Sequence, residues 1–164
     1  MLGPRELEEA LRREGVSFRI VEVPRAATAR EASDSLGVPM ERIAKTVVLV
    51  SEGGDVVLVV VRADRRVDQA KLARLLGFKK LRLATDEEVT SSTGYPPGGV
   101  PPVGHARRLP VYLDAELLGA GPVYAGGGDE RHLLLINPED IVRLAGAQVI
   151  EVPKKAWRQA SDRR

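Results

Sequence analysis

Two runs rich in β-branched residues, joined by a short glycine-containing loop, constrain the fold more than any other part of the sequence. The runs are residues 43–50 (IAKTVVLV) and 56–61 (VVLVVV), and the loop is residues 51–55 (SEGGD). Short, continuous apolar runs of this kind are typical of strands buried in the middle of a sheet. The short loop predicts a hairpin, in which the strands pair antiparallel. We therefore expect this hairpin to lie at the centre of a sheet.

The rest of the chain predicts further strands and helices that do not alternate strictly. Helix patterns cover residues 6–14, 28–36, 68–76, 86–91 and 138–145, and strand patterns cover 16–23, 79–84, 109–114, 121–128, 131–136 and 147–152. Thr28 with Glu31 forms a capping-box pattern, Thr85 or Asp86 should cap its helix, and Asn137 before Pro138 is an expected N-cap. Such an order predicts one α+β domain over residues 1–152, with a mixed, mostly antiparallel sheet flanked by helices. Residues 153–164 (PKKAWRQASDRR) should form a basic tail that frays.

Composition excludes several classes of protein and site. No cysteine is present, which excludes disulfides and thiol catalysis and fits a cytoplasmic protein. No apolar run approaches the roughly 18 residues of a membrane span. There is no G-x-S-x-G motif, and two histidines are too few for a His-rich zinc site, so we expect neither a metal nor a cofactor. The formal charge of +2 permits a nucleic-acid partner without requiring one.

The glycine- and proline-rich segment 92–110 (STGYPPGGVPPVGHARRLP) is the least ordinary stretch, because it lies between well-patterned elements. Its residues 99–104 have the glycine spacing of a P-loop, but His105 follows where a lysine is required. One interpretation is a set of tight turns; the other is that its glycines let the backbone approach a ligand where a Cβ would intrude. Lys45 also has two interpretations, a solvated lysine or a cation aimed into a cleft. His132 either packs or takes part in a site.

Three motifs together resemble the YbaK/ProX family, free-standing relatives of the editing domain of bacterial prolyl-tRNA synthetases. They are A-K-T at residues 44–46, S-T-G-Y-x-x-G-G-x-x-P-x-G at residues 92–104, and G-G at residues 127–128. They occur in the family order and spacing, and the resemblance runs from the first helix to about Val152. It implies a YbaK-like fold with a barrel-like sheet. It also implies hydrolysis of the ester between a wrong amino acid and tRNA, often alanyl- or cysteinyl-tRNA(Pro).

The resemblance also implies roles for particular residues. Lys45 corresponds to the family lysine that contacts the substrate near the terminal adenosine, and it is our candidate catalytic residue. The loop from Gly98 to Pro102 corresponds to the one that shapes the aminoacyl pocket, so its prolines and glycines would form a preorganised wall. The full set of substrate-binding candidates is Thr46, Gly98, Gly99, Pro102, Gly126, Gly127, Gly128 and His132. Gly126 stands where some cysteinyl-tRNA deacylases carry serine, which bears on amino-acid specificity.

Without an evident protein nucleophile, we expect substrate-assisted hydrolysis. The ribose hydroxyl beside the ester would help to activate water, while Lys45 and loop amides stabilise negative charge. Arg107, Arg108, Lys154 and Lys155 are candidates for contacts with the acceptor stem, or they form a solvated basic face. The partners expected are mischarged tRNA and prolyl-tRNA synthetase, and no membrane. A non-catalytic tRNA- or synthetase-binding module and a hydrolase of another small ester or amide are the alternatives.

Overall fold

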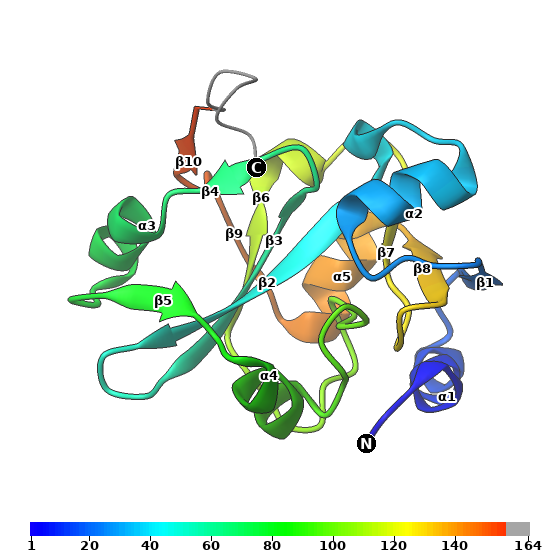
Figure 1. The fold of residues 1–164 in the computed structure, drawn as a ribbon, viewed down its shortest axis with the longest axis horizontal. Coiled ribbons are helices and arrows are strands. Elements are labelled where there is room, and N and C mark those ends of the chain that lie inside the picture. Colours follow the sequence, from blue (N-terminus) through cyan, green and yellow to red (C-terminus); the bar gives the residue numbers. More distant parts are fainter. Residues whose placement is uncertain (157–164) are drawn as a thin grey trace.

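The computed structural model describes residues 1–156 and is organised around the expected hairpin (Figure 1). β2 (Ala44–Ser51) and β3 (Val56–Arg62) pair antiparallel, with Val47 opposite Val59. The middle of β3 is buried on both faces, as its valine-rich sequence predicts. The hairpin at the centre of a sheet is therefore confirmed.

Three more strands extend the hairpin into a five-stranded sheet with the order β5-β2-β3-β6-β9. β5 (Leu81–Leu83) pairs antiparallel with β2, whereas β6 (Val111–Asp114) and β9 (Gln148–Ile150) run parallel to β3 and to β6, respectively. This sheet is mixed, as expected. Its parallel half is built from strands that are distant in sequence.

A second, antiparallel sheet has the order β1-β8-β7 and lies beside the start of β2. It contains β1 (Phe18–Glu22), β8 (His132–Ile136) and β7 (Val123–Gly126). A single parallel bridge between Ile43 and Tyr124 links this sheet to the residue before β2. The expected single α+β domain is confirmed, but its sheets do not close into a barrel within residues 1–156.

Five α-helices cover these sheets, and most of the expected N-caps are present. They are α1 (Pro4–Glu14), α2 (Ala29–Leu36), α3 (Gln69–Leu76), α4 (Asp86–Thr93) and α5 (Pro138–Ala145), with 3₁₀ turns η1 (Met40–Arg42) and η2 (Ala115–Leu117). Thr28 and Glu31 exchange two 3.1 Å hydrogen bonds at the start of α2, which confirms the capping box. Asn137 occupies the N-cap of α5, but its side chain makes no capping hydrogen bond. Within residues 1–156, every helix is too short or too polar to cross a bilayer.

The alternation of side chains along the hairpin divides the main core into two layers. Leu49, Val57, Val59 and Val61 face one side, where they pack with Leu72 and Ala73 of α3. Val48, Leu58 and Val60 face the other side, where they pack with residues of α1, α4 and α5. Figure 1 shows α3 on one side of the hairpin and α2 beside the start of β2, at the opposite end of the strand.

The segment after Val152 differs from the expectation that it frays from Pro153 onward. Lys154–Lys155 form a short strand, β10, that pairs antiparallel with β4 (Arg66–Val67). The Lys154 amine lies 2.7 Å from Oδ2 of Asp114, a residue with only 1% of its surface exposed. This contact is an ion pair whose angles are not those of a hydrogen bond. The beginning of the expected tail is thus part of the fold, and residues 157–164 lie outside the described residues.

Candidate active site

A cavity of about 280 Å³ opens where α2, the start of β2, the end of β7 and the glycine- and proline-rich segment meet. Its wall includes Lys45, Thr46 and Gly98 of the family motifs, and Gly126, which directly precedes the G-G motif. The sequence places them up to 81 positions apart, so the fold alone brings them together. The other lining residues are Ala26, Ala27, Thr28, Ala29, Ala32, Ile43, Ala44, Val100, Ala125 and Leu133.

Lys45 is the cationic residue of this wall. It is the second residue of β2, lies opposite Val61 of β3 and is half-buried. Burial lowers the pKa of its amine, because a charge is less stable away from water, and the nearby charge of Asp64 opposes this effect only in part. Among the described residues, no carboxylate lies within ion-pair distance of the Lys45 amine. The amine is therefore a partly desolvated cation that can bind an anionic or polarised oxygen in the cavity.

Thr46 adds a second polar group to the same wall. Its Oγ1 is buried and has no hydrogen-bond partner among residues 1–156. A buried hydroxyl without a partner costs free energy, because water no longer satisfies it.

Alanines form most of the apolar wall. Ala26, Ala27, Ala29 and Ala32 come from the loop before α2 and from α2 itself, while Ala44 and Ala125 come from β2 and β7. Each contributes a single methyl group, and the hydroxyl of Thr28, which also lines the wall, accepts the capping hydrogen bond from the Glu31 N–H. Sequence reasoning missed this feature. The three alanines within residues 26–29 are its only visible signal, because Ala44 and Ala125 join the wall through tertiary structure.

The glycines beside the cavity pack backbone against backbone. A Cβ added at Gly98, whose φ is +83°, would lie 3.3 Å from the Ala27 carbonyl oxygen, and φ itself favours glycine there. A Cβ added at Gly99 would lie 2.6 Å from the backbone nitrogen of Asp129, and one at Gly126 would collide with the carbonyl of Val100. The proposed intrusion of a Gly99 Cβ into ligand space is not what the structure shows. Gly99 instead allows the two loops to touch.

The remaining candidates of the two loops lie outside the cavity wall. Gly127 packs against the backbone of His132, and Gly128 packs against Pro4 of α1 while its N–H donates to the Gly99 carbonyl oxygen over 2.9 Å. Pro102 is buried but does not line the cavity. Gly127 and Gly128 therefore make backbone contacts with neighbouring segments outside this wall.

His132 also lies outside the cavity wall. Its Nδ1 donates to Oδ1 of Asp129 over 2.7 Å, and the backbone N–H of Arg131 donates to the same oxygen over 2.8 Å. Burial raises the pKa of Asp129, but these hydrogen bonds outweigh it and hold the pKa below its ordinary value. The pair therefore stiffens the turn between β7 and β8. In this arrangement, neither side chain contributes to the wall beside Lys45.

The four basic candidates do not form one surface. Arg107 and Arg108 line a cavity of about 230 Å³ beside α5, where the Arg108 guanidinium lies against Gly146 at the C-terminal end of that helix. Lys154 is held by Asp114, and Lys155 lines a different cavity of about 350 Å³. Within residues 1–156, no cluster of His, Cys, Asp and Glu side chains could hold a metal ion.

Known proteins with similar sequences and folds share this part of the chain. Residues 23–144 match the family described as "Aminoacyl-tRNA editing domain". An Enterococcus faecalis protein, provisionally named Cys-tRNA(Pro)/Cys-tRNA(Cys) deacylase EbsC, is 30% identical over 128 residues, which cover 78% of each chain. A proline–tRNA ligase of Nitratidesulfovibrio vulgaris is 40% identical over 114 residues, covering 69% of this chain but only 20% of the ligase.

A solved structure extends the likeness to the fold. Provisionally named a trans-editing enzyme for prolyl tRNA synthetase, it is 41% identical to this chain and has a TM-score of 0.83. The superposition covers 93% of this chain and 97% of the other. The cavity wall, residues 26–133, lies entirely within the segment that matches the family.

Proposed function

The chain belongs to the family of aminoacyl-tRNA editing domains, and on this premise we propose that it hydrolyses the ester of mischarged aminoacyl-tRNA in trans. The observation that carries the proposal is the partly desolvated amine of Lys45 in the wall of a cavity whose lining lies within the segment that matches the family. A cation suits the phosphate and the ester oxygen of an aminoacyl-tRNA. Such a substrate also implies activity in the cytoplasm, where translation takes place.

The size and character of the wall favour a small aminoacyl group. A cavity of about 280 Å³ has to admit the amino acid together with part of the terminal adenosine. Alanine methyl groups provide apolar contact with a short side chain, and no charged side chain besides Lys45 is present on this wall. We therefore propose alanyl- or cysteinyl-tRNA(Pro) as the substrate. The name of the E. faecalis relative supports the cysteinyl alternative.

Lys45 would act as a preorganised positive charge. In ester hydrolysis, the carbonyl oxygen becomes an oxyanion in the tetrahedral intermediate, and the terminal phosphate carries charge throughout. A cation held against either oxygen stabilises the transition state more strongly in a partly dry cavity than in water. Thr46 lines the same cavity, and the backbone at Gly98 and Gly126 would fix the position of the aminoacyl group.

The attacking water would be activated by the substrate itself. The described wall contains no carboxylate or imidazole, and His132 and Asp129 bind one another outside it. The free ribose hydroxyl beside the ester lies close to the carbonyl carbon in any bound pose. It would relay a proton: it accepts one from water as the C–O bond to water forms and passes its own to the neighbouring ribose oxygen as the ester C–O bond breaks. The reaction consumes only water, so the proposal requires no cofactor.

The test is a panel of aminoacyl-tRNAs incubated with the full-length chain. We expect loss of the ester from alanyl- or cysteinyl-tRNA(Pro), with prolyl-tRNA(Pro) spared, and no such loss with Lys45→Met. Binding of these tRNAs without hydrolysis would instead identify a non-catalytic module. Adding prolyl-tRNA synthetase to the same assay tests whether that enzyme is a partner. A higher rate with the synthetase than with an equal amount of albumin would support the partnership.

A further inference from the structure

A second concave region, lined by basic side chains, lies at the α3 side of the five-stranded sheet. This basic cavity has a volume of about 350 Å³ and receives five cationic side chains from four parts of the chain. β4 provides Arg66, α3 provides Arg74, the residues before β5 provide Lys79 and Lys80, and β10 provides Lys155. The other lining residues are Val67, Gln69, Ala70 and Leu81, so no carboxylate faces the cavity.

These five charges are not neutralised by ion pairs in the described part of the chain. Elsewhere, arginines pair with acidic residues, as Arg62 does with Asp64 and Arg82 with Glu88. Glu52 is the nearby acid, and it accepts hydrogen bonds from the backbone N–H groups of residues 79 and 80 rather than from their amines. The formal charge of the chain is +2, so removing these five charges would leave −3 for all other residues. Positive charge is therefore concentrated in one hollow, where the surrounding protein focuses the field.

The chemistry of the lining favours phosphate groups over bases. No aromatic side chain lines the basic cavity, so stacking of bases is not available. The neighbouring Phe78 packs into the core beneath α3. Two guanidinium groups and three amines can bind several phosphate oxygens at once. An extended polyanion such as a nucleic-acid backbone satisfies this arrangement better than a single small anion.

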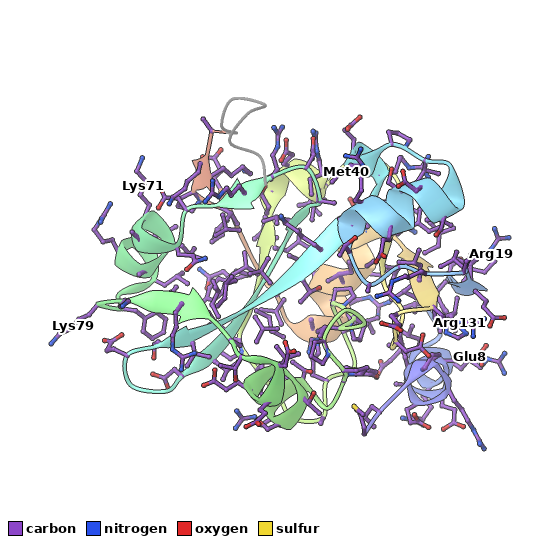
Figure 2. All side chains as sticks on the ribbon, in the orientation of Figure 1. Glu8, Arg19, Met40, Lys71, Lys79 and Arg131 are labelled. Atoms are coloured by element: carbon purple, nitrogen blue, oxygen red, sulfur yellow. The ribbon has the colours of Figure 1, made fainter. Side chains whose placement is uncertain are left out.

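The basic cavity and Lys45 share one face of the five-stranded sheet. Lys45 alternates along β2 with Val47 and Leu49, and these two residues pack into the cluster beneath α3. Four residues of strand, from Lys45 to Leu49, span roughly 13 Å. Figure 2 shows Lys71 and Lys79 together at the α3 end of the molecule, far from Arg19 and Arg131 at the other end. Lys45 and the basic cavity therefore lie on the same face of the sheet, with α3 packed between them.

We propose that the basic cavity binds backbone phosphates of the tRNA whose aminoacyl end lies at Lys45. This proposal rests on the proposed function for its choice of RNA. It assigns Arg66, Arg74, Lys79 and Lys80 to RNA binding, and it extends the role expected of Lys155. The contacts are with phosphates and therefore contribute affinity without base specificity.

The test measures binding of uncharged tRNA(Pro) to the full-length chain between 50 and 200 mM salt, an experiment that requires no hydrolysis. The variant Arg74→Gln/Lys80→Gln removes two charges from the cavity. Each lost phosphate contact should make the slope of log K against log salt shallower by about 0.9. The matched control, Arg13→Gln/Arg19→Gln, removes the same net charge from two exposed positions of α1 and β1, far from the cavity in sequence. Thermal melting checks that both variants remain folded.

A slope shallower by about 1.8 in the cavity variant, with little change in the control, supports the proposal. Equal slopes in the wild type and the cavity variant overturn it. Equal losses in the two variants also overturn it, since binding would then follow net charge alone. If the slope changes as expected but no aminoacyl-tRNA is hydrolysed, the RNA surface stands and the proposed enzymatic function fails. If hydrolysis is found and the slope is unchanged, the proposed enzymatic function stands and the RNA surface fails.

Discussion

The backbone N–H of Gly128 donates a 2.9 Å hydrogen bond to the carbonyl oxygen of Gly99, so the two glycine-containing loops beside the cavity hold each other directly. The approach is close enough that a Cβ at Gly99 would lie 2.6 Å from the nitrogen of Asp129. Neither partner at this contact is a flexible side chain. The position of the cavity wall therefore depends on a glycine that does not itself line the cavity.

Gly99→Ala should consequently reduce stability as well as activity, whereas the sequence alone favoured an effect on activity. Overpacking of this kind typically costs about 1–3 kcal/mol of unfolding free energy. Urea unfolding measures this loss, and deacylation assays measure the accompanying shift of the wall. Gly53→Ala is the matched control, because its Cβ would lie 3.8 Å from the nearest atom, a side-chain oxygen of Asp55. An unchanged unfolding midpoint for Gly99→Ala would contradict the packing argument.

Lys45→Ala should reduce deacylation by about 10²-fold or more, the usual effect of removing a preorganised group that stabilises developing charge. The residue lines the cavity and has no ion-pair partner among the described residues, so its removal breaks no bridge. Lys71→Ala, on the exposed face of α3, provides the control for loss of a lysine. Single-turnover rates on alanyl-tRNA(Pro) provide the measurement. A folded Lys45→Ala protein with the wild-type rate would show that the amine is not used.

The lowered pKa of Lys45 predicts how stability changes with pH. The folded protein releases this proton at a lower pH than the unfolded chain, whose lysine titrates near 10.5. Between the two pKa values the unfolded state binds more protons, so this residue makes stability rise with pH. Below that window the desolvated cation destabilises the folded state, and Lys45→Met should be the more stable protein at pH 7.

Urea unfolding of wild type and Lys45→Met from pH 7 to 10.5 tests this sign, because other titrating groups cancel in the difference. We expect the variant's advantage to shrink as the pH rises. A constant difference across this range would show that burial does not perturb the amine.

Lys154→Met should destabilise the protein far more than Lys155→Met. Lys154 is the ion-pair partner of the buried Asp114, and removing one member of such a pair leaves a buried charge uncompensated. The expected loss is about 3 kcal/mol, at the low end for buried pairs because the amine is partly exposed. Urea midpoints of the two variants give the comparison. Asp114→Asn added to Lys154→Met should recover part of the loss, and an absence of recovery would point to another role for Lys154.

A substrate in which hydrogen replaces the free ribose hydroxyl beside the ester tests whether the substrate or a protein group activates the water. Deoxy alanyl-tRNA should bind about as well as the normal substrate but be hydrolysed far more slowly. The alanyl ester is required, because a cysteinyl thiol could attack the ester itself. Turnover of the deoxy substrate at the normal rate would overturn substrate assistance. Loss of that turnover in His132→Ala or Asp129→Ala would then identify a protein base.

Local signals predicted local structure well. The Thr28–Glu31 capping box and the hairpin of β2 and β3 depend on residues close in sequence, and both were visible in the pattern. The pairing of Lys154 with Val67 was not, because a two-residue strand has no periodicity to detect. The ion-pair partner of Lys154, Asp114, is buried only by the tertiary structure.

The candidate site divides in the same way. Lys45, Thr46, Gly98 and Gly126 could be named through the family motifs, and they do line one cavity. The alanine wall could not, because Ala125 lies almost a hundred residues from the alanines before α2. The purpose of the glycines was also hidden, since a sequence pattern does not distinguish glycine that faces a ligand from glycine that faces another backbone.

Contact between two backbones has a consequence for how such a protein can evolve. A clash between side chains can be relieved when one of them is replaced by a smaller one. Gly99 and the backbone of Asp129 contain no side-chain atoms at this contact that a substitution could remove. Neighbouring mutations therefore offer little rescue, and the paired loops should resist divergence. Changes in amino-acid preference are easier at the alanines of α2 and β7, where a larger residue alters the volume of the cavity without separating the loops. Among related proteins, the two loops would keep their sequence, while substitutions in the alanine wall change which aminoacyl group the cavity accepts.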